Sequence, residues 1–237
     1  MLFKIVPRID PRYWAALTLA SVFGANTGDF AARTLHLGHV SGLPYLAAIF
    51  VVILLAERFS AVRWEGWYWL AIITVRTAAT NLADLTAHDA KLGAYQVAAA
   101  LLVVLVVLLL VRRAVTGGTD TSNVPRADLG YWLAMLTAGT LGTALADGLA
   151  GDLSLPTATA LTGIAVAVAL GVQVRQALPV AASYWLAVVA IRTFGTNLGD
   201  LTARTFGLLP STLISGLALL ALLGLWRPRA ALAPSAA

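Results

Sequence analysis

The sequence predicts an all-α membrane protein in which eight transmembrane helices form four parallel two-helix repeats. Of the 237 residues, 59% are hydrophobic and only 11% are charged, and the mean hydropathy is +0.84. A typical soluble domain is about a quarter charged, so this composition indicates an integral membrane protein. Long apolar runs recur along the chain, and one polar motif recurs in alternate runs.

A bilayer core requires about 20 apolar residues per helix. Stretches of this kind occupy residues 13–33, 42–57, 67–87, 93–111, 130–150, 155–174, 183–203 and 208–226. Lipid cannot satisfy bare backbone amide groups, so each stretch is expected to be helical. A polar segment divides the chain, and the expected organisation is repeats one and two at 1–113, a linker at 114–129, and repeats three and four at 130–237.

A Tyr-Trp pair opens every odd-numbered span, and an Asp follows each Trp after 15 residues. The pairs are Tyr13-Trp14, Tyr68-Trp69, Tyr131-Trp132 and Tyr184-Trp185, and the acids are Asp29, Asp84, Asp147 and Asp200. Each unit is therefore expected to contain one motif helix and one plain apolar helix, with all units pointing the same way. The aromatic pairs are interpreted as anchors at the membrane–water interface.

The distribution of Lys and Arg predicts the orientation, because basic residues concentrate in cytoplasmic loops. Three of these residues lie on the side away from the termini: Arg33, Lys91 and Arg204. Eleven lie on the side of the termini: Lys4, Arg8, Arg12, Arg58, Arg63, Arg112, Arg113, Arg126, Arg175, Arg227 and Arg229. Both termini are therefore expected in the cytoplasm.

Each Asp is expected inside the outer half of the membrane, because 15 helical residues rise about 22 Å across a core of about 30 Å. Residues three and seven positions earlier share a helix face with it. These are Asn26, Asn81 and Asn197, and Thr77, Thr140 and Thr193. Small residues one and five positions before each Asp favour close helix packing, so the polar stripes are expected to face a shared interior.

Arg76 and Arg192 lie eight residues before Asp84 and Asp200 and are also embedded. Ionisable groups inside a membrane usually mark a function and often pair with one another. Four Asp and two Arg carry −4 + 2 = −2, a charge that one divalent cation or two protons would neutralise. The two arginines are read first as counter-charges to the acids, with direct contact to an anionic substrate as the alternative.

The first functional hypothesis is a transporter of a small cation, with the four Asp and the three Asn as metal ligands. The three Thr, with Arg76 and Arg192, are the candidate substrate-binding residues. All of these ligands except the arginines are hard oxygen donors, which favours Mn²⁺, Mg²⁺, Ca²⁺ or Na⁺ over Zn²⁺ or Cu⁺. Mn²⁺ is slightly preferred, as a transported substrate, and no other cofactor is expected.

Two alternatives stay open. One is a transporter of an anionic or polar organic solute that uses Arg76 and Arg192, and the other is a membrane scaffold that transports nothing, in which the acids only hold helices together. The sequence has no enzyme signature of the G-x-S-x-G, H-E-x-x-H or P-loop kinds, so no enzyme is expected. The expected partners are the lipid bilayer and a small solute, not nucleic acid, and homo-oligomerisation is left open.

The repeat also carries a family resemblance. The segments are YWLAIITVRTAATNLADLTA, YWLAMLTAGTLGTALADGLA, YWLAVVAIRTFGTNLGDLTA and the less regular YWAALTLASVFGANTGDFAA. The chain resembles a bacterial family of membrane proteins with four tandem two-helix repeats, described as uncharacterised membrane-anchored proteins. The resemblance implies this fold over nearly the whole chain and implies no activity. Asn26 stands where the family pattern has an acidic residue, which removes one acidic ligand from the first unit.

Overall fold

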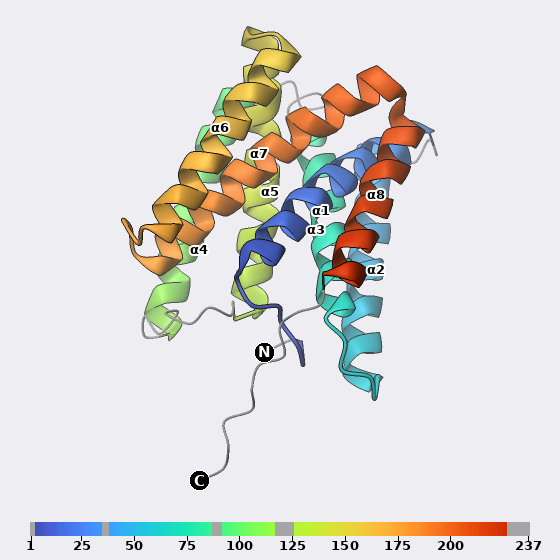
Figure 1. Cartoon of the computed structure of the whole chain (residues 1–237), viewed down its shortest axis with the longest axis vertical. Coiled ribbons are helices and arrows are strands. Elements are labelled where there is room, and N and C mark those ends of the chain that lie inside the picture. The colour runs from blue at the N-terminus through green and yellow to red at the C-terminus, as the bar shows by residue number, and fades with distance from the viewer. Residues whose placement is uncertain (1–2, 35–37, 87–91, 117–125, 227–237) are drawn as a thin grey trace.

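The computed structural model describes residues 3–34, 38–86, 92–116 and 126–226 (Figure 1). Over these ranges the chain forms eight α-helices and one π-helical turn, and it contains no strand. The elements are α1 (Pro11–Asp29), η1 (Phe30–Thr34), α2 (His39–Phe59), α3 (Gly66–Asp84), α4 (Ala94–Thr116), α5 (Leu129–Asp152), α6 (Leu155–Val174), α7 (Val180–Phe206) and α8 (Leu208–Leu225).

The prediction of an all-helical fold is confirmed, and every expected span coincides with one α-helix. The largest difference at one end is in α4, which ends five residues beyond the predicted end of its span at 111, and α7 extends three residues beyond its predicted span at each end. Most of the expected linker at 114–129 lies outside the described residues, which leave out 117–125. On either side of it, α4 ends at Thr116 and α5 begins at Leu129.

Among the described residues, five helices are long and apolar enough to cross a membrane, which indicates a membrane protein: α2, α4, α5, α6 and α8. The remaining three, α1, α3 and α7, do not meet that criterion in the described part of the chain. They carry buried polar residues such as Asn26, Arg76 and Arg192, and these lower their apolar character. The position of α1, α3 and α7 inside the bundle explains how a membrane protein can contain helices with these polar residues.

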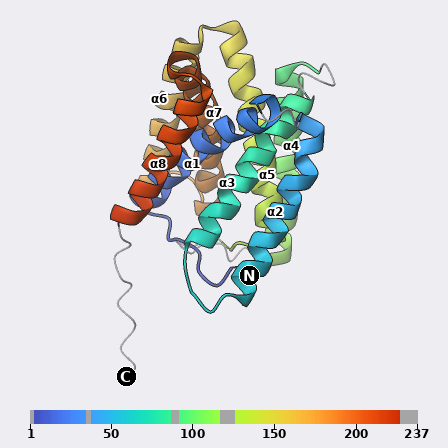
Figure 2. The ribbon, with the colours of Figure 1, turned by 90° about the vertical axis from the view of Figure 1, so that its right-hand side faces the viewer.

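Four inner helices form a closed ring in which α1 packs on α3, α3 on α5, α5 on α7, and α7 on α1. All four run in the same direction, from the end where α1 begins to the opposite end (Figures 1 and 2). Each outer helix packs mainly on the inner helix of the next unit: α2 on α3, α4 on α5, α6 on α7, and α8 on α1. The repeats therefore interlock around the ring, and α8 closes it.

Burial separates the two sets of helices. Outer helices turn apolar side chains outward, as with Val103 on α4 and Leu217 on α8, which are 63% and 65% exposed. Inner helices bury most of their polar residues, including Arg76 and Arg192 at 0% exposure. Because lipid tails are as apolar as leucine, the outer helices can face them at no cost while they shield the polar inner ring.

The Tyr-Trp pairs lie inside the bundle, so their interpretation as lipid-facing interface anchors is wrong. All eight side chains are between 0% and 8% exposed. Each Trp packs edge-on against its own Tyr, with ring centroids 5.2–5.4 Å apart, and also contacts the Tyr of the preceding unit at 5.5–5.8 Å. This aromatic annulus joins all four repeats at the end of the bundle where α1 begins.

The segment before α1 covers the annulus. Phe3 is 4% exposed and its ring lies 5.3 Å from Trp132 and 6.2 Å from Tyr68. The Lys4 ammonium donates to the backbone carbonyls of Glu57, Arg58 and Ser60, each at 2.8 Å. These carbonyls belong to the end of α2, where a cation satisfies otherwise unpaired acceptors and complements the helix dipole.

Removing one member of the annulus is expected to destabilise the whole bundle. Replacing Trp69, which is 1% exposed, by Ala leaves a large cavity and is expected to cost about 3–5 kcal/mol. The measurement is thermal unfolding of the purified protein in detergent. Trp64→Ala serves as the control, because Trp64 is 55% exposed and its loss is expected to cost about 0.5 kcal/mol or less. Equal destabilisation by the two variants would contradict the structural role of the annulus.

Candidate functional site

The polar residues of the inner helices form layers along the bundle axis. Positions four residues apart stay on one helix face, and counting back from each Asp in steps of four gives buried layers. They are Ala25, Thr80, Thr143 and Thr196; then Ser21, Arg76, Gly139 and Arg192; then Leu17, Ile72, Met135 and Val188; and finally the four tyrosines. Hydrogen bonds that cross between helices within these layers place them at the centre of the ring.

The tyrosine layer closes one end of the axis. Oxygen–oxygen distances are 2.9 Å from Tyr13 to Tyr68, 3.0 Å from Tyr131 to Tyr184 and 2.6 Å from Tyr184 to Tyr13. A fourth hydrogen bond joins Tyr68 to Tyr131 and completes the ring. The adjoining Leu17, Ile72, Met135 and Val188 are all 0% exposed. This end of the axis is therefore sealed by hydroxyls that satisfy one another and by an apolar layer.

Arg76 fills the middle of the axis and is hydrogen-bonded to all four inner helices. Its Nη1 donates to Thr143 Oγ1 at 2.8 Å and to Thr80 Oγ1 at 3.1 Å, and its Nη2 donates to Thr196 Oγ1 at 2.6 Å. Its Nε donates to the hydroxyl and carbonyl oxygens of Ser21 at 3.2 and 3.3 Å. A β-carbon on Gly24 would lie 2.6 Å from Arg76 Cγ, so a glycine is required there.

Three of the four predicted acids line one open cavity at the other end of the axis. This cavity has a volume of about 450 Å³ and is lined by Asp29, Arg33, Asp147, Ala150, Gly151, Asp200, Ala203, Arg204 and Leu208. Asp147 Oδ2 is buried and has no hydrogen-bond partner in the described part of the chain. The arrangement presents carboxylates from α1, α5 and α7 to a space that a cation can enter.

Asp84 takes a deeper position than the other acids. It is 5% exposed and does not line the cavity, but it interacts electrostatically with Asp147, Asp200 and Arg76. Asp29 lies at the wall of the cavity, with Arg33 Nη2 at 3.4 Å from its Oδ1. The backbone after both acids is π-helical, over Phe30–Thr34 and at 85–86, and such turns are frequent at functional sites.

The predicted Asn residues face the outer helices instead of the cavity. Asn26 Nδ2 donates to Ser211 Oγ on α8 at 2.7 Å, and Asn197 Nδ2 donates to Thr162 Oγ1 on α6 at 3.4 Å. Asn81 is fully buried, and its amide nitrogen lies 3.0 Å from where a β-carbon on Gly42 of α2 would stand. The amides of Asn26 and Asn197 thus join inner helices to outer helices, a common and modest stabilisation of about 1 kcal/mol in membranes, whereas the Asn81 amide has no hydrogen-bond partner among the described residues.

The predicted Thr residues donate to backbone carbonyls. Thr77 Oγ1 donates to the Gly24 carbonyl on α1 at 3.2 Å, whereas Thr140 and Thr193 donate to carbonyls of their own helices at 3.0 Å. The threonines on the axis are Thr80, Thr143 and Thr196, which the sequence analysis did not single out. The signal that identifies them is the shared position four residues before Asp in three of the four units.

The predicted metal ligands do not form one coordination shell around a single point. Among the residues that the structure describes, no three His, Asp or Glu side chains come close enough together to hold one ion. The acids surround a space instead of converging on a point. A cation in this cavity would therefore keep much of its hydration shell.

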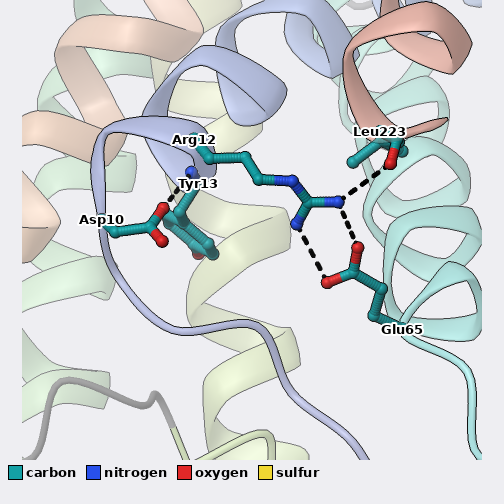
Figure 3. A network of polar contacts seen from close by, with 5 residues as sticks. All are labelled: Asp10, Arg12, Tyr13, Glu65 and Leu223. Atoms are coloured by element: carbon teal, nitrogen blue, oxygen red, sulfur yellow. Dashed lines mark hydrogen bonds and ion pairs between the residues drawn. The ribbon is translucent and has the colours of Figure 1, made fainter. Parts of the chain in front are cut away.

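A partly buried ion pair holds the closed end together (Figure 3). Arg12, at the start of α1, is 3% exposed and binds both carboxylate oxygens of Glu65, just before α3. Arg12 Nη2 also donates to the Leu223 carbonyl near the end of α8 at 3.1 Å. Asp10 caps α1 by accepting the Tyr13 backbone N–H at 2.8 Å, and Asp128 caps α5 in the same way. These contacts fix the helix ends that carry the tyrosine ring.

Substituting Thr196 by Val tests the arginine layer, because valine keeps the shape and removes the hydroxyl that accepts from Arg76. Leaving part of a buried guanidinium unpaired is expected to cost about 1–3 kcal/mol in the free energy of unfolding. Thr205→Val on the same helix is the control, since Thr205 is exposed and its hydroxyl bonds only to the Leu201 carbonyl. Chemical unfolding in detergent measures both, and equal stability of the two variants would rule out the assigned role of Thr196.

Comparison with known proteins adds a family but no activity. Residues 12–62 and 183–229 match the family described as Repeat of Unknown Function (DUF347). These segments contain α1 with α2 and α7 with α8, the first and last units of the ring. No curated protein and no solved structure matches the chain. Two segments of the chain therefore match the repeat of this family of unknown function, and the resemblance inferred from the sequence is confirmed for the first and last units.

Proposed function

We propose that this protein is an integral membrane transporter of a small cation, which it captures between Asp29, Asp147 and Asp200. One observation carries the proposal: three carboxylates at equivalent positions of three repeats share one open cavity at the mouth of a polar axis. Charged groups within a membrane are costly and usually serve an ion or solute pathway. Interhelical bonding alone does not require acids at one depth in every repeat.

The size of the cavity favours a hydrated cation. A water molecule occupies about 30 Å³ in the liquid, so a cavity of about 450 Å³ accommodates an ion with its first hydration shell. Small hard cations such as Mg²⁺ keep several waters in protein sites. Mn²⁺ is the first candidate substrate, and Mg²⁺, Ca²⁺ and Na⁺ are the alternatives to test with it.

The proposed topology has all eight helices crossing a bacterial inner membrane, with both termini in the cytoplasm. The excess of Lys and Arg on the side of the termini supports this orientation. The outer helices enclose α1, α3 and α7, which supports spans for helices that are less apolar. The acidic cavity would then open away from the cytoplasm, and transport would require the tyrosine ring to part.

A second candidate is a transporter of an anionic or polar organic solute. The observation in its favour is Arg192, whose Nε and Nη1 are buried without hydrogen-bond partners in the described part of the chain. Against it, Arg76 is fully engaged by Ser21 and threonine hydroxyls, and three acids line the cavity at the open end. A scaffold that transports nothing is the third reading, and it predicts no flux of any solute.

Flux into proteoliposomes tests the proposal. The double variant Asp147→Asn/Asp200→Asn is expected to lower saturable Mn²⁺, Mg²⁺, Ca²⁺ or Na⁺ uptake at least about tenfold, which corresponds to about 1.4 kcal/mol. Asp152→Asn is the matched control: Asp152 ends α5, is exposed, and bonds to the Tyr95 hydroxyl outside the cavity. Undiminished flux in the double variant, or no cation flux in the native protein, would refute a cation pathway.

The arginines that line the cavity predict a substitution with the opposite effect: removing one of them should improve cation binding. Arg204 lines the cavity and repels a cation, so Arg204→Gln is expected to lower the KM for the transported cation about threefold at low salt. The difference should shrink as ionic strength rises, because salt screens exposed charges. Arg58→Gln, at the exposed end of α2, should leave KM unchanged. A higher KM for Arg204→Gln would instead favour an anionic substrate.

A further inference from the structure

Arg76 and Arg192 occupy the same position in the second and fourth repeats but have opposite surroundings. Both are 0% exposed. The guanidinium of Arg76 is hydrogen-bonded to four hydroxyls, as described above. Arg192 makes one weak contact, from Nη2 to Met135 Sδ at 3.8 Å, while its Nε and Nη1 have no partner among the described residues. One repeat therefore satisfies its arginine from within the protein and the other does not.

An arginine in this state is costly. Guanidinium carries five N–H donors and stays protonated in proteins, and a buried unpaired charge costs several kcal/mol. The site is nevertheless built into the helix packing, because a β-carbon on Gly142 would lie 2.5 Å from Arg192 Cβ. This is the counterpart of Gly24 beside Arg76. The fold thus places both arginines by the same device and supplies hydroxyl partners to only one.

The unpaired donors lie toward the sealed end of the axis. Helical side chains lean toward the N-terminus of their helix, and α7 begins at the end that carries the tyrosine ring. Arg192 contacts Met135 of the apolar layer and interacts electrostatically with all four ring tyrosines. Arg76 points the other way, to Thr80, Thr143 and Thr196. Along the bundle axis, the Arg192 guanidinium therefore lies just inside the protein from the ring of tyrosine hydroxyls.

We propose that Arg192 and the tyrosine ring form a binding site for one small inorganic anion of halide size, such as chloride. The guanidinium would donate to the anion, and a ring hydroxyl could turn to donate as well. Leu17, Ile72, Met135 and Val188, the layer between Arg192 and the tyrosines, are apolar and fully buried, which favours a small anion over an organic one. The proposal does not depend on cation transport, because the acids that line the cavity lie at the other end of the axis.

Thermal unfolding in different salts tests the site. Purified full-length protein in detergent would be compared in sodium chloride, bromide and gluconate at equal ionic strength, since gluconate is too large to enter. A Tm about 5 °C higher in chloride and bromide, with saturation, is expected for a ligand well above its Kd. Arg192→Gln should lose the dependence, whereas Arg76→Gln, with the same loss of charge at the same repeat position, should keep it.

Anomalous scattering from bromide in crystals of the native protein gives a second measurement that does not require the variants to fold. A bromide peak within hydrogen-bonding distance of Arg192 is expected. Equal Tm in gluconate and chloride, a dependence that survives Arg192→Gln, or no bromide beside Arg192 would each overturn the proposal. The Asp147→Asn/Asp200→Asn variant should keep its chloride dependence, so failure of the cation proposal and failure of this one are distinguishable.

Discussion

Charged and polar groups of the inner helices must turn toward the interior of the protein, because lipid offers them no partner. This constraint explains the two-layer arrangement. Outer helices present apolar side chains outward, and inner helices direct Arg76 and its hydroxyl partners to the axis. It also accounts for the packing of each outer helix on the inner helix of the next repeat, which covers much of the inner ring.

The polar groups of the axis depend on positions at which the four repeats carry different residues. The aromatic annulus repeats almost identically in all units, and it determines the architecture. Two layers away, equivalent positions carry Ser21, Arg76, Gly139 and Arg192. Two bulky cations and two small residues fit together where four arginines would collide and repel. The ring thus places Arg76 among hydroxyls, Arg192 near the tyrosines, and the carboxylates around a space at the open end.

The sequence was sufficient to predict the helices, the repeats and the acids, because apolar length and a fixed Trp-to-Asp spacing are local signals. It did not predict which side of each inner helix faces the axis. Positions three and four residues before an Asp are both close to it on a helix, and the packing chose Thr80 over Asn81. The Tyr-Trp pairs were misplaced for a similar reason, since amphipathic rings suit a membrane interface and a buried hydrogen-bonded ring equally well. Which cation enters the cavity depends on its hydration, which no local pattern encodes.

Water access along the axis tests the central claim, that the axis is open at the aspartates and sealed at the tyrosines. The chain contains no Cys, so single cysteines can be introduced without a competing thiol. Ala203→Cys, in the cavity lining, and Val188→Cys, in the apolar layer, lie on the same helix. A water-soluble, membrane-impermeant maleimide applied from the side away from the termini should label the first rapidly and spare the second. Equal labelling of both, or protection of Ala203→Cys from both sides, would contradict this account.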